Sequence, residues 1–197
     1  MKSAFYQVER YMPMWLIVMK GEAFSGKSTL ARALGRELGW PLVDKDDVKD
    51  LLDGHVQAAG PLAYAIMFNM ARSLLLQGLH VICDSPLTGS ISYERAQGIA
   101  TQTHACLAVV ECTCSDESVW RQRITTRKTL QLPTHHQTDW DAYQVLLRQS
   151  QFQEHLYTIT HPHLVVDTIQ PLQECLTAIL TWLDRLNPAP RRHVLLA

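Results

Sequence analysis

The sequence lacks any long hydrophobic run, and it lacks an excess of charge of either sign. Its longest apolar stretches, such as residues 12–19, fall well short of a membrane-spanning helix, which needs about 18 residues. Lysine and arginine number 18 and aspartate and glutamate 19, which gives a net charge of -1. A protein that binds nucleic acid without regard to sequence usually carries a basic excess. We therefore expect no membrane partner, and a small-molecule partner is favoured over nucleic acid.

Cysteine is present, but never in a paired motif. The 5 cysteines are an odd number, and no two of them form a CxxC pair. Cys112 and Cys114 have a single residue between them, a spacing that fits no common zinc site. The beginning of the chain is polar and mixed in charge, unlike a secretory signal peptide. These features predict a cytoplasmic protein whose thiols stay reduced.

Short apolar runs alternate with longer amphipathic stretches along the chain. Strands are expected at residues 15–19, 41–43, 79–83, 105–112 and 164–167. Helices are expected at residues 28–38, 61–77, 92–103, 115–128, 140–155 and 172–186, and a short helix or turn at 46–52. Ser115 is expected as the N-cap of the helix at 115–128. This alternation predicts a three-layer α/β fold, in which helices cover both faces of a parallel sheet. One domain, residues 14–187, is expected between an N-terminal extension (1–13) and a C-terminal tail (188–197).

A glycine-rich motif follows the first expected strand and opens the first expected helix. It reads Gly21-Glu22-Ala23-Phe24-Ser25-Gly26-Lys27-Ser28, a complete match to GxxxxGK[ST], and Thr29 follows it. The backbone N–H groups of such a loop point at phosphate oxygens, and the helix adds the positive end of its dipole. Lys27 is expected to reach the β- and γ-phosphates of ATP, and the Ser28 hydroxyl group to bind Mg²⁺. The whole motif is therefore predicted to bind ATP.

Acidic residues stand where two further expected strands end. Asp84 follows an apolar run and is expected to hold Mg²⁺ through water or to position a substrate. The alternative for Asp84 is a cap on the next turn. Residues 44–49, Asp-Lys-Asp-Asp-Val-Lys, follow the second strand. Their pattern alone fits a solvated helix start as well as a substrate site, because aspartate is favoured at a helix N-terminus.

Together these motifs resemble those of the small P-loop kinases, which include adenylyl-sulfate kinase, gluconate kinase, chloramphenicol phosphotransferase, zeta toxin and the 5′-kinase domain of polynucleotide kinase. The resemblance is strongest to the broad family described as predicted kinases with an AAA-type ATP-binding domain. It rests on Leu-Val-Asp-Lys-Asp-Asp-Val-Lys at 42–49, Asp-Ser-Pro-Leu at 84–87 and Glu-Cys-x-Cys-Ser-Asp-Glu at 111–117. It covers roughly residues 15–185. It implies a P-loop NTPase fold with five parallel strands in the order 2-3-1-4-5 and a helical lid at about residues 121–140.

The resemblance also assigns the acceptor side. In the stretch that corresponds to residues 44–49, adenylyl-sulfate kinase reads Asp-Gly-Asp-Asn-Val-Arg and polynucleotide kinase reads Asn-Arg-Asp-Asp-Tyr-Arg. The third position is a general base in both, which implies that Asp46 accepts the proton of the acceptor hydroxyl group. The last position binds substrate through an arginine, and Lys49 stands there in this chain. A lysine offers a point charge in place of a planar fork, so the resemblance does not fix a phosphate-bearing acceptor.

The expected helix at 115–128 carries Arg123 and Arg127 four residues apart on one face. In related kinases an arginine at this end clamps the transferring phosphate. The resemblance implies that role for Arg127 and a place nearer the base or the α-phosphate for Arg123. The alternative is a solvated basic face. Trp140 and Tyr143 are expected to pack the lid rather than to stack on a base.

The residues and the resemblance together predict an ATP- and Mg²⁺-dependent kinase that phosphorylates a hydroxyl group of a small molecule. A polynucleotide 5′-hydroxyl kinase is the alternative within this class, because such kinases resemble the chain at Asp46 and Arg127. An ATP-binding and hydrolysing switch with no organic acceptor is the alternative from another class. Asp46 separates the two classes, because a switch needs no base that faces an organic hydroxyl group.

Overall fold

The computed structural model describes residues 13–129, 139–154 and 157–186. Its strands are β1 (Trp15–Lys20), β2 (Leu42–Asp44), β3 (Val81–Asp84), β4 (Cys106–Thr113) and β5 (His163–Asp167). Its helices are α1 (Lys27–Leu38), α2 (Lys45–Leu52), α3 (Ala59–Leu76), α4 (Ser90–Thr103), α5 (Glu117–Thr129), α6 (Trp140–Glu154) and α7 (Leu172–Leu186). Every expected strand and helix is present, with small differences at the ends.

Three parts of the expected domain plan lie outside the described residues. These parts are the N-terminal extension apart from residue 13, the tip of the lid (130–138) and the C-terminal tail. Within the described ranges, no helix is both long and apolar enough to cross a bilayer.

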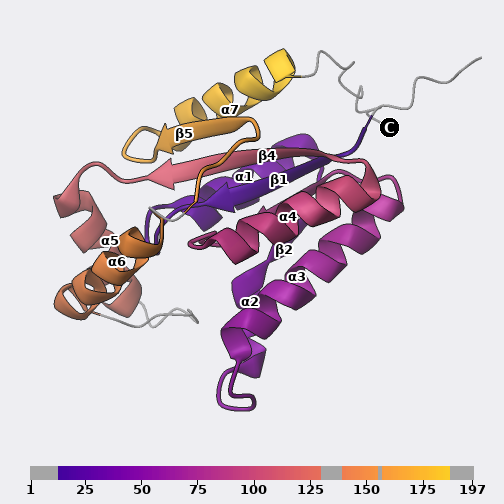
Figure 1. Cartoon of the computed structure of the whole chain (residues 1–197). Helices are drawn as coiled ribbons and strands as arrows, with labels where there is room; N and C mark the ends of the chain where they lie inside the picture. Colours follow the sequence, from indigo (N-terminus) through magenta and orange to yellow (C-terminus); the bar gives the residue numbers. More distant parts are fainter. Residues whose placement is uncertain (1–12, 130–138, 155–156, 187–197) are drawn as a thin grey trace, which may run out of the picture.

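The strands form one parallel sheet in the order β2-β3-β1-β4-β5. This confirms the order 2-3-1-4-5. Helices α1 and α7 cover one face of the sheet, and α3 and α4 cover the other (Figure 1). The chain therefore has the three-layer architecture of a P-loop domain, and the C-terminal ends of its strands meet at one edge. In open α/β sheets, ligands bind at that edge.

Strand β1 is buried along its whole length because helices cover both of its faces. Leu16 and Val18 point into the core beneath α3 and α4, whereas Ile17 and Met19 point into the core beneath α1 and α7. This two-sided burial explains why the sequence shows a continuous apolar run here instead of alternation. The chain leaves β1 at the ligand-binding edge, directly before the glycine-rich motif.

The N-terminus of α5 corrects one expectation. Asp116, not Ser115, caps this helix, because Asp116 Oδ1 accepts hydrogen bonds from the N–H groups of Ser118 (2.8 Å) and Val119 (3.3 Å). Ser115 instead donates its N–H and hydroxyl group to the carboxylate of Asp167 at the end of β5. Both residue types are good N-caps. A partner 52 residues away decides between them.

All five cysteines carry free thiols, as the sequence predicts. Burial raises the pKa of the Cys112 thiol to about 12, and it also raises the pKa of Cys83. Such thiols stay protonated at neutral pH and are therefore weak nucleophiles and weak metal ligands. Cys83 and Cys112 thus belong to the packing of the core.

Candidate active site

The glycine-rich motif forms a loop between β1 and α1 that requires glycine at two positions. Gly21 has a φ of 140° and Gly26 a φ of 86°. A Cβ atom on Gly21 would lie 2.4 Å from the carbonyl oxygen of Cys112, and one on Gly26 would lie 3.0 Å from Thr168 Oγ1. Gly26 is also the N-cap of α1 and provides no side-chain cap. The N–H groups of the first turn are therefore left for an anion.

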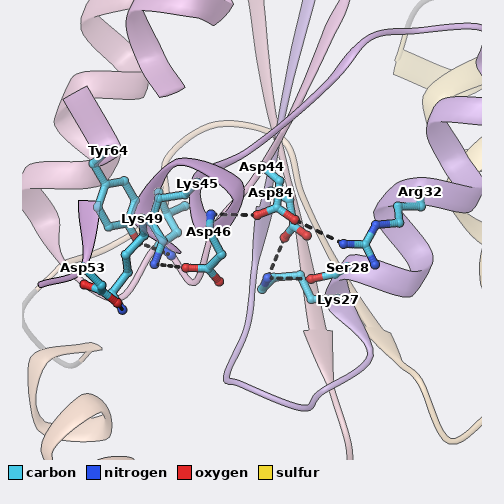
Figure 2. A network of polar contacts seen from close by, with 11 residues as sticks. Lys27, Ser28, Arg32, Asp44, Lys45, Asp46, Lys49, Asp53, Tyr64 and Asp84 are labelled. Atoms are coloured by element: carbon cyan, nitrogen blue, oxygen red, sulfur yellow. Dashed lines mark hydrogen bonds and ion pairs between the residues drawn. The ribbon is translucent and has the colours of Figure 1, made fainter. Parts of the chain in front are cut away.

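Lys27, in the first turn of α1, is buried and ion-paired with Asp84 at the end of β3. Lys27 Nζ lies 2.5 Å from Asp84 Oδ1 and 3.5 Å from the hydroxyl oxygen of Ser28 (Figure 2). The three residues that the sequence assigns to phosphate and metal therefore meet at one point. A buried carboxylate needs such a counter-charge, because water cannot solvate it there.

The second oxygen of Asp84 suggests what else this point can bind. Asp84 Oδ2 is buried and has no hydrogen-bond partner among the described residues. A buried acceptor without a partner is costly, and an absent ion often explains it. Mg²⁺ prefers oxygen ligands and keeps several waters or phosphate oxygens. The carboxylate of Asp84 and the hydroxyl group of Ser28 fit this ion in the presence of nucleotide phosphates.

Asp44, at the end of β2, lies in register with Asp84 on the neighbouring strand. Asp44 Oδ1 accepts a hydrogen bond from the N–H of Asp46 at 2.9 Å and so caps α2. Its other oxygen lies 3.5 Å from Arg32 Nη2, an ion pair without a hydrogen bond. Burial, and then the charge of Asp84, raise the pKa of Asp44. Asp44 thereby ties α2 to the sheet and to α1.

Asp46, the expected general base, stands in the first turn of α2. Its Oδ1 lies 2.6 Å from Nζ of Lys45. Lys45 is 6% exposed, and its Nζ lies 5.4 Å from the centre of the Tyr64 ring on α3. Figure 2 shows the Asp46 side chain between this Lys45–Tyr64 pair and Lys27. The hydrogen bond from the Asp46 N–H to the Asp44 carboxylate holds Asp46 at the same edge of the sheet as the glycine-rich loop.

Lys49, expected to contact the acceptor, is bound to its own helix. Its Nζ lies 2.8 Å from Asp53 Oδ2, an i,i+4 ion pair in which 49% of the Asp53 side chain is exposed. A surface pair of this kind contributes about 0.5 kcal/mol or less. An acceptor could therefore displace Asp53 from Lys49 at little cost.

The lid helices contact the glycine-rich loop at Ala23 and Phe24. Ala23 O accepts hydrogen bonds from the indole N–H of Trp120 on α5 (2.9 Å) and from the hydroxyl group of Tyr143 on α6 (3.0 Å). Tyr143 also meets the Phe24 ring edge-on, with centroids 5.4 Å apart. Trp140 packs against the same cluster. This confirms that Trp140 and Tyr143 pack the lid.

Arg127 brings a positive charge from the lid to this edge. Its guanidinium lies 5.1 Å from the centre of the Phe24 ring. Burial lowers the pKa of Arg127, and the neighbouring cation Arg32 lowers it further. Arginine stays charged at neutral pH nonetheless. A half-buried guanidinium next to a second cation is well suited to an anionic ligand.

A pocket of ≈ 620 Å³ lies beside the loop, between α5 and the start of α7. Arg123 crosses it and donates hydrogen bonds to Thr168 Oγ1 (2.9 Å) and Thr168 O (2.7 Å). Thr168 Oγ1 also binds the carbonyl oxygen of Ser25, which fastens the β5–α7 turn to the loop. The lining further includes Thr29, Leu30, Val119, Gln170, Leu172 and Cys175. Its size and mixed lining are in the range of small-molecule ligand sites.

Residues 16–154 match the protein family described as AAA domain. The chain belongs to this family. No curated protein matches it significantly in sequence. Among solved structures, it is similar to a candidate kinase from Chloroflexus aurantiacus, with 26% identity and a TM-score of 0.71 over 88% of this chain and 98% of the other.

Two further structures have the same fold as this AAA domain at lower identity. A gluconokinase from Sinorhizobium meliloti 1021 is 20% identical, with a TM-score of 0.61 over 91% of this chain and 95% of the other. The APS kinase of Mycobacterium tuberculosis, in complex with AMPPNP and APS, is 15% identical, with a TM-score of 0.60 over 88% and 99% of the two chains. The fold is therefore that of the small P-loop kinases.

Several residues of the AAA domain's site carry no local signal in the sequence. Arg32 meets Asp44 across two elements, and Thr168 meets Ser25 across 143 residues. Trp120 reads as an ordinary aromatic on a helix. Lys45 reads as one charge in a mixed run, although its burial sets it apart. The role of each residue in the site can be recognised only from the folded structure, in which these elements lie next to one another.

Proposed function

We propose that this AAA domain transfers the γ-phosphate of ATP to a hydroxyl group of a small molecule. In this reaction the acceptor oxygen forms a bond to the γ-phosphorus, the bond between that phosphorus and the β,γ-bridging oxygen breaks, and ADP leaves. The acceptor proton passes to Asp46. Catalysis of this kind rests on position and charge, which the described residues provide.

The donor side is supported by the loop and the pocket. Residues 21–29 would hold the phosphates, with Lys27 moving from Asp84 to the β- and γ-phosphates. The adenine base of ATP would occupy the pocket beside Arg123, and Arg127 would contact the transferring phosphate. Bound Mg²⁺, held by Ser28 and Asp84, would neutralise phosphate charge. The similar APS kinase, whose structure contains AMPPNP, supports ATP as the donor.

The observation that carries the proposal is the position of Asp46. The Asp46 N–H donates a hydrogen bond to Asp44, which lies in register with Asp84 on the neighbouring strand. Asp84 in turn forms the ion pair with Lys27 of the phosphate loop. A carboxylate is thereby placed beside the phosphate loop, on a helix outside the glycine-rich motif. A switch that only hydrolyses ATP needs no base that faces an organic hydroxyl group.

The charge of α2 favours a small acceptor over a polynucleotide. Residues 45–53 contain four aspartates and two lysines. Asp47 and Asp50 are exposed, and Lys49 is paired with Asp53. A strand-tracking groove needs basic residues and stacking aromatics instead. The acceptor that fits best is therefore a compact hydroxyl compound.

The test offers the full chain radiolabelled ATP with four acceptor classes in parallel: sugars, nucleosides, hydroxylated antibiotics and 5′-hydroxyl oligonucleotides. Lys27→Met is the control for label that does not depend on the phosphate loop. We expect label in a small-molecule product with the wild type and none with Lys27→Met. Label in oligonucleotides, weakening steeply with salt, would identify a polynucleotide kinase. Label released only as inorganic phosphate would identify a hydrolysing switch.

A further inference from the structure

Lys45 is an unusual residue at the start of a helix. A cation in the first turn opposes the helix dipole, which favours acidic residues there. Lys45 is also 6% exposed, and lysine is rarely buried without a partner. Both the helix dipole and burial therefore destabilise a lysine at this position, and contacts with neighbouring residues have to offset that cost.

The compensation comes from two contacts. Lys45 Nζ lies 2.6 Å from Asp46 Oδ1, and the Tyr64 ring lies under the ammonium group at 5.4 Å. The ring contact holds Lys45 on the side of α2 that faces α3. Burial raises the pKa of Tyr64 to about 12, so the phenol group stays neutral. Neighbours one residue apart on a helix do not normally face each other. Here the pairing fixes the direction in which the Asp46 carboxylate points.

The structure assigns Lys45 as a positioning residue for Asp46: its charge keeps the carboxylate ionised and turned toward the acceptor. The functional meaning rests on the proposed role of Asp46 as general base. In the reaction the acceptor proton goes to Asp46 and then to water, and Lys45 takes no part in the transfer. Lys45 therefore acts through Asp46 and forms no bond to the acceptor.

Other charged groups also act on Asp46 and have to be held constant in a test. Asp44, at the end of β2, adds negative charge, and Arg127, on α5, adds positive charge. Tyr64, on α3, is neutral in the working range of pH. Lys45 is in ion-pair contact with Asp46, with Nζ 2.6 Å from Oδ1. Replacing Lys45 alone therefore isolates its effect.

The first measurement needs neither ATP nor an acceptor. The carboxyl carbon of Asp46 is followed by ¹³C NMR against pH, and its resonance is assigned by its loss in Asp46→Asn. We expect it to titrate at higher pH in Lys45→Met and Lys45→Gln than in the wild type, because an opposite charge within about 4 Å favours the ionised form. Lys45→Arg should restore the wild-type curve. Arg72→Met, which removes an exposed cation from α3, should leave the curve unchanged.

The second measurement follows phosphate transfer against pH with an acceptor found in the panel above. Lys45→Met and Lys45→Gln should lose about tenfold or more at the acidic end and recover toward the wild type at the alkaline end, because Asp46 is then ionised without help. Lys45→Arg should retain activity. A residue that only supported the fold would lower the rate equally at every pH.

Two results would overturn the assignment. One is an Asp46 titration that is the same in the wild type and in both neutral variants. The other is a loss of transfer that does not depend on pH. Failure to phosphorylate any acceptor would instead refute the proposed function, and the NMR titration would still decide whether Lys45 controls Asp46.

Discussion

Lys27 and Asp84 form a buried ion pair in which Nζ lies 2.5 Å from Oδ1, although the two residues are 57 positions apart in the chain. The pair joins the first residue of α1 to the last residue of β3. A nucleotide that takes Lys27 for its phosphates therefore leaves Asp84 free for a metal ion. Donor binding and metal binding are expected to support each other for this reason.

The first prediction concerns this pair. Lys27→Met leaves a buried carboxylate without its counter-charge, and it should lower the free energy of unfolding by about 3 kcal/mol. Adding Asp84→Asn should recover most of that loss, because the uncompensated charge is then gone, while ATP turnover should stay absent. Chemical denaturation of the wild type, both single variants and the double variant measures the coupling. Strictly additive effects would show that the pair does not form in solution.

The sequence could predict the phosphate loop and the fold because their signals are local. Gly21 and Gly26 meet backbone requirements that only glycine satisfies well, and β1 needs six buried residues in succession. Asp46 could be singled out only through the resemblance, since aspartate is common at helix starts. Its role stays a proposal.

The partners of the site residues could not be predicted in the same way. Arg32, Lys45 and Thr168 acquire meaning from contacts that cross strands or helices. Ser115 shows the same limit, because its position before a helix predicts a cap and its contact with Asp167 overrides it. Contacts between elements that are distant in the chain depend on the fold, so no short stretch of sequence predicts them.

A second prediction concerns the lid. Arg127→Ala should lower kcat by about 10³, and it should raise KM for ATP much less, because the guanidinium contact strengthens as charge develops in the transition state. Lys128→Ala is the matched control, because it removes an exposed cation from the neighbouring position of the same helix, so kcat should stay near the wild type. Steady-state kinetics with both variants separates the two parameters. An effect of Arg127→Ala on KM alone would make it a binding residue only.

A third prediction concerns stability against pH. Burial raises the pKa of Asp44 in the folded chain above its ordinary value, 3.8, so ionising it opposes folding. Asp44→Asn keeps an N-cap acceptor but removes this charge. The variant should therefore be more stable than the wild type at neutral pH, and the difference should shrink as pH falls, because below 3.8 both the folded and the unfolded state bind the proton. Thermal unfolding from pH 4 to pH 8 measures this difference. A gap that widens in acid would reverse the sign and contradict the account.

The most direct test of the account measures ATP consumption with and without acceptor, in the wild type and in Asp46→Asn. Asn keeps the shape of the side chain but cannot take a proton. The account predicts that an acceptor stimulates ATP consumption by the wild type, and that Asp46→Asn loses at least about 10² of the stimulated rate while binding ATP within a few-fold of normal. Asp47→Asn, at the exposed neighbouring position, should retain the stimulation. ATP consumption that responds neither to any acceptor nor to Asp46→Asn would contradict the account and leave a hydrolysing switch in its place.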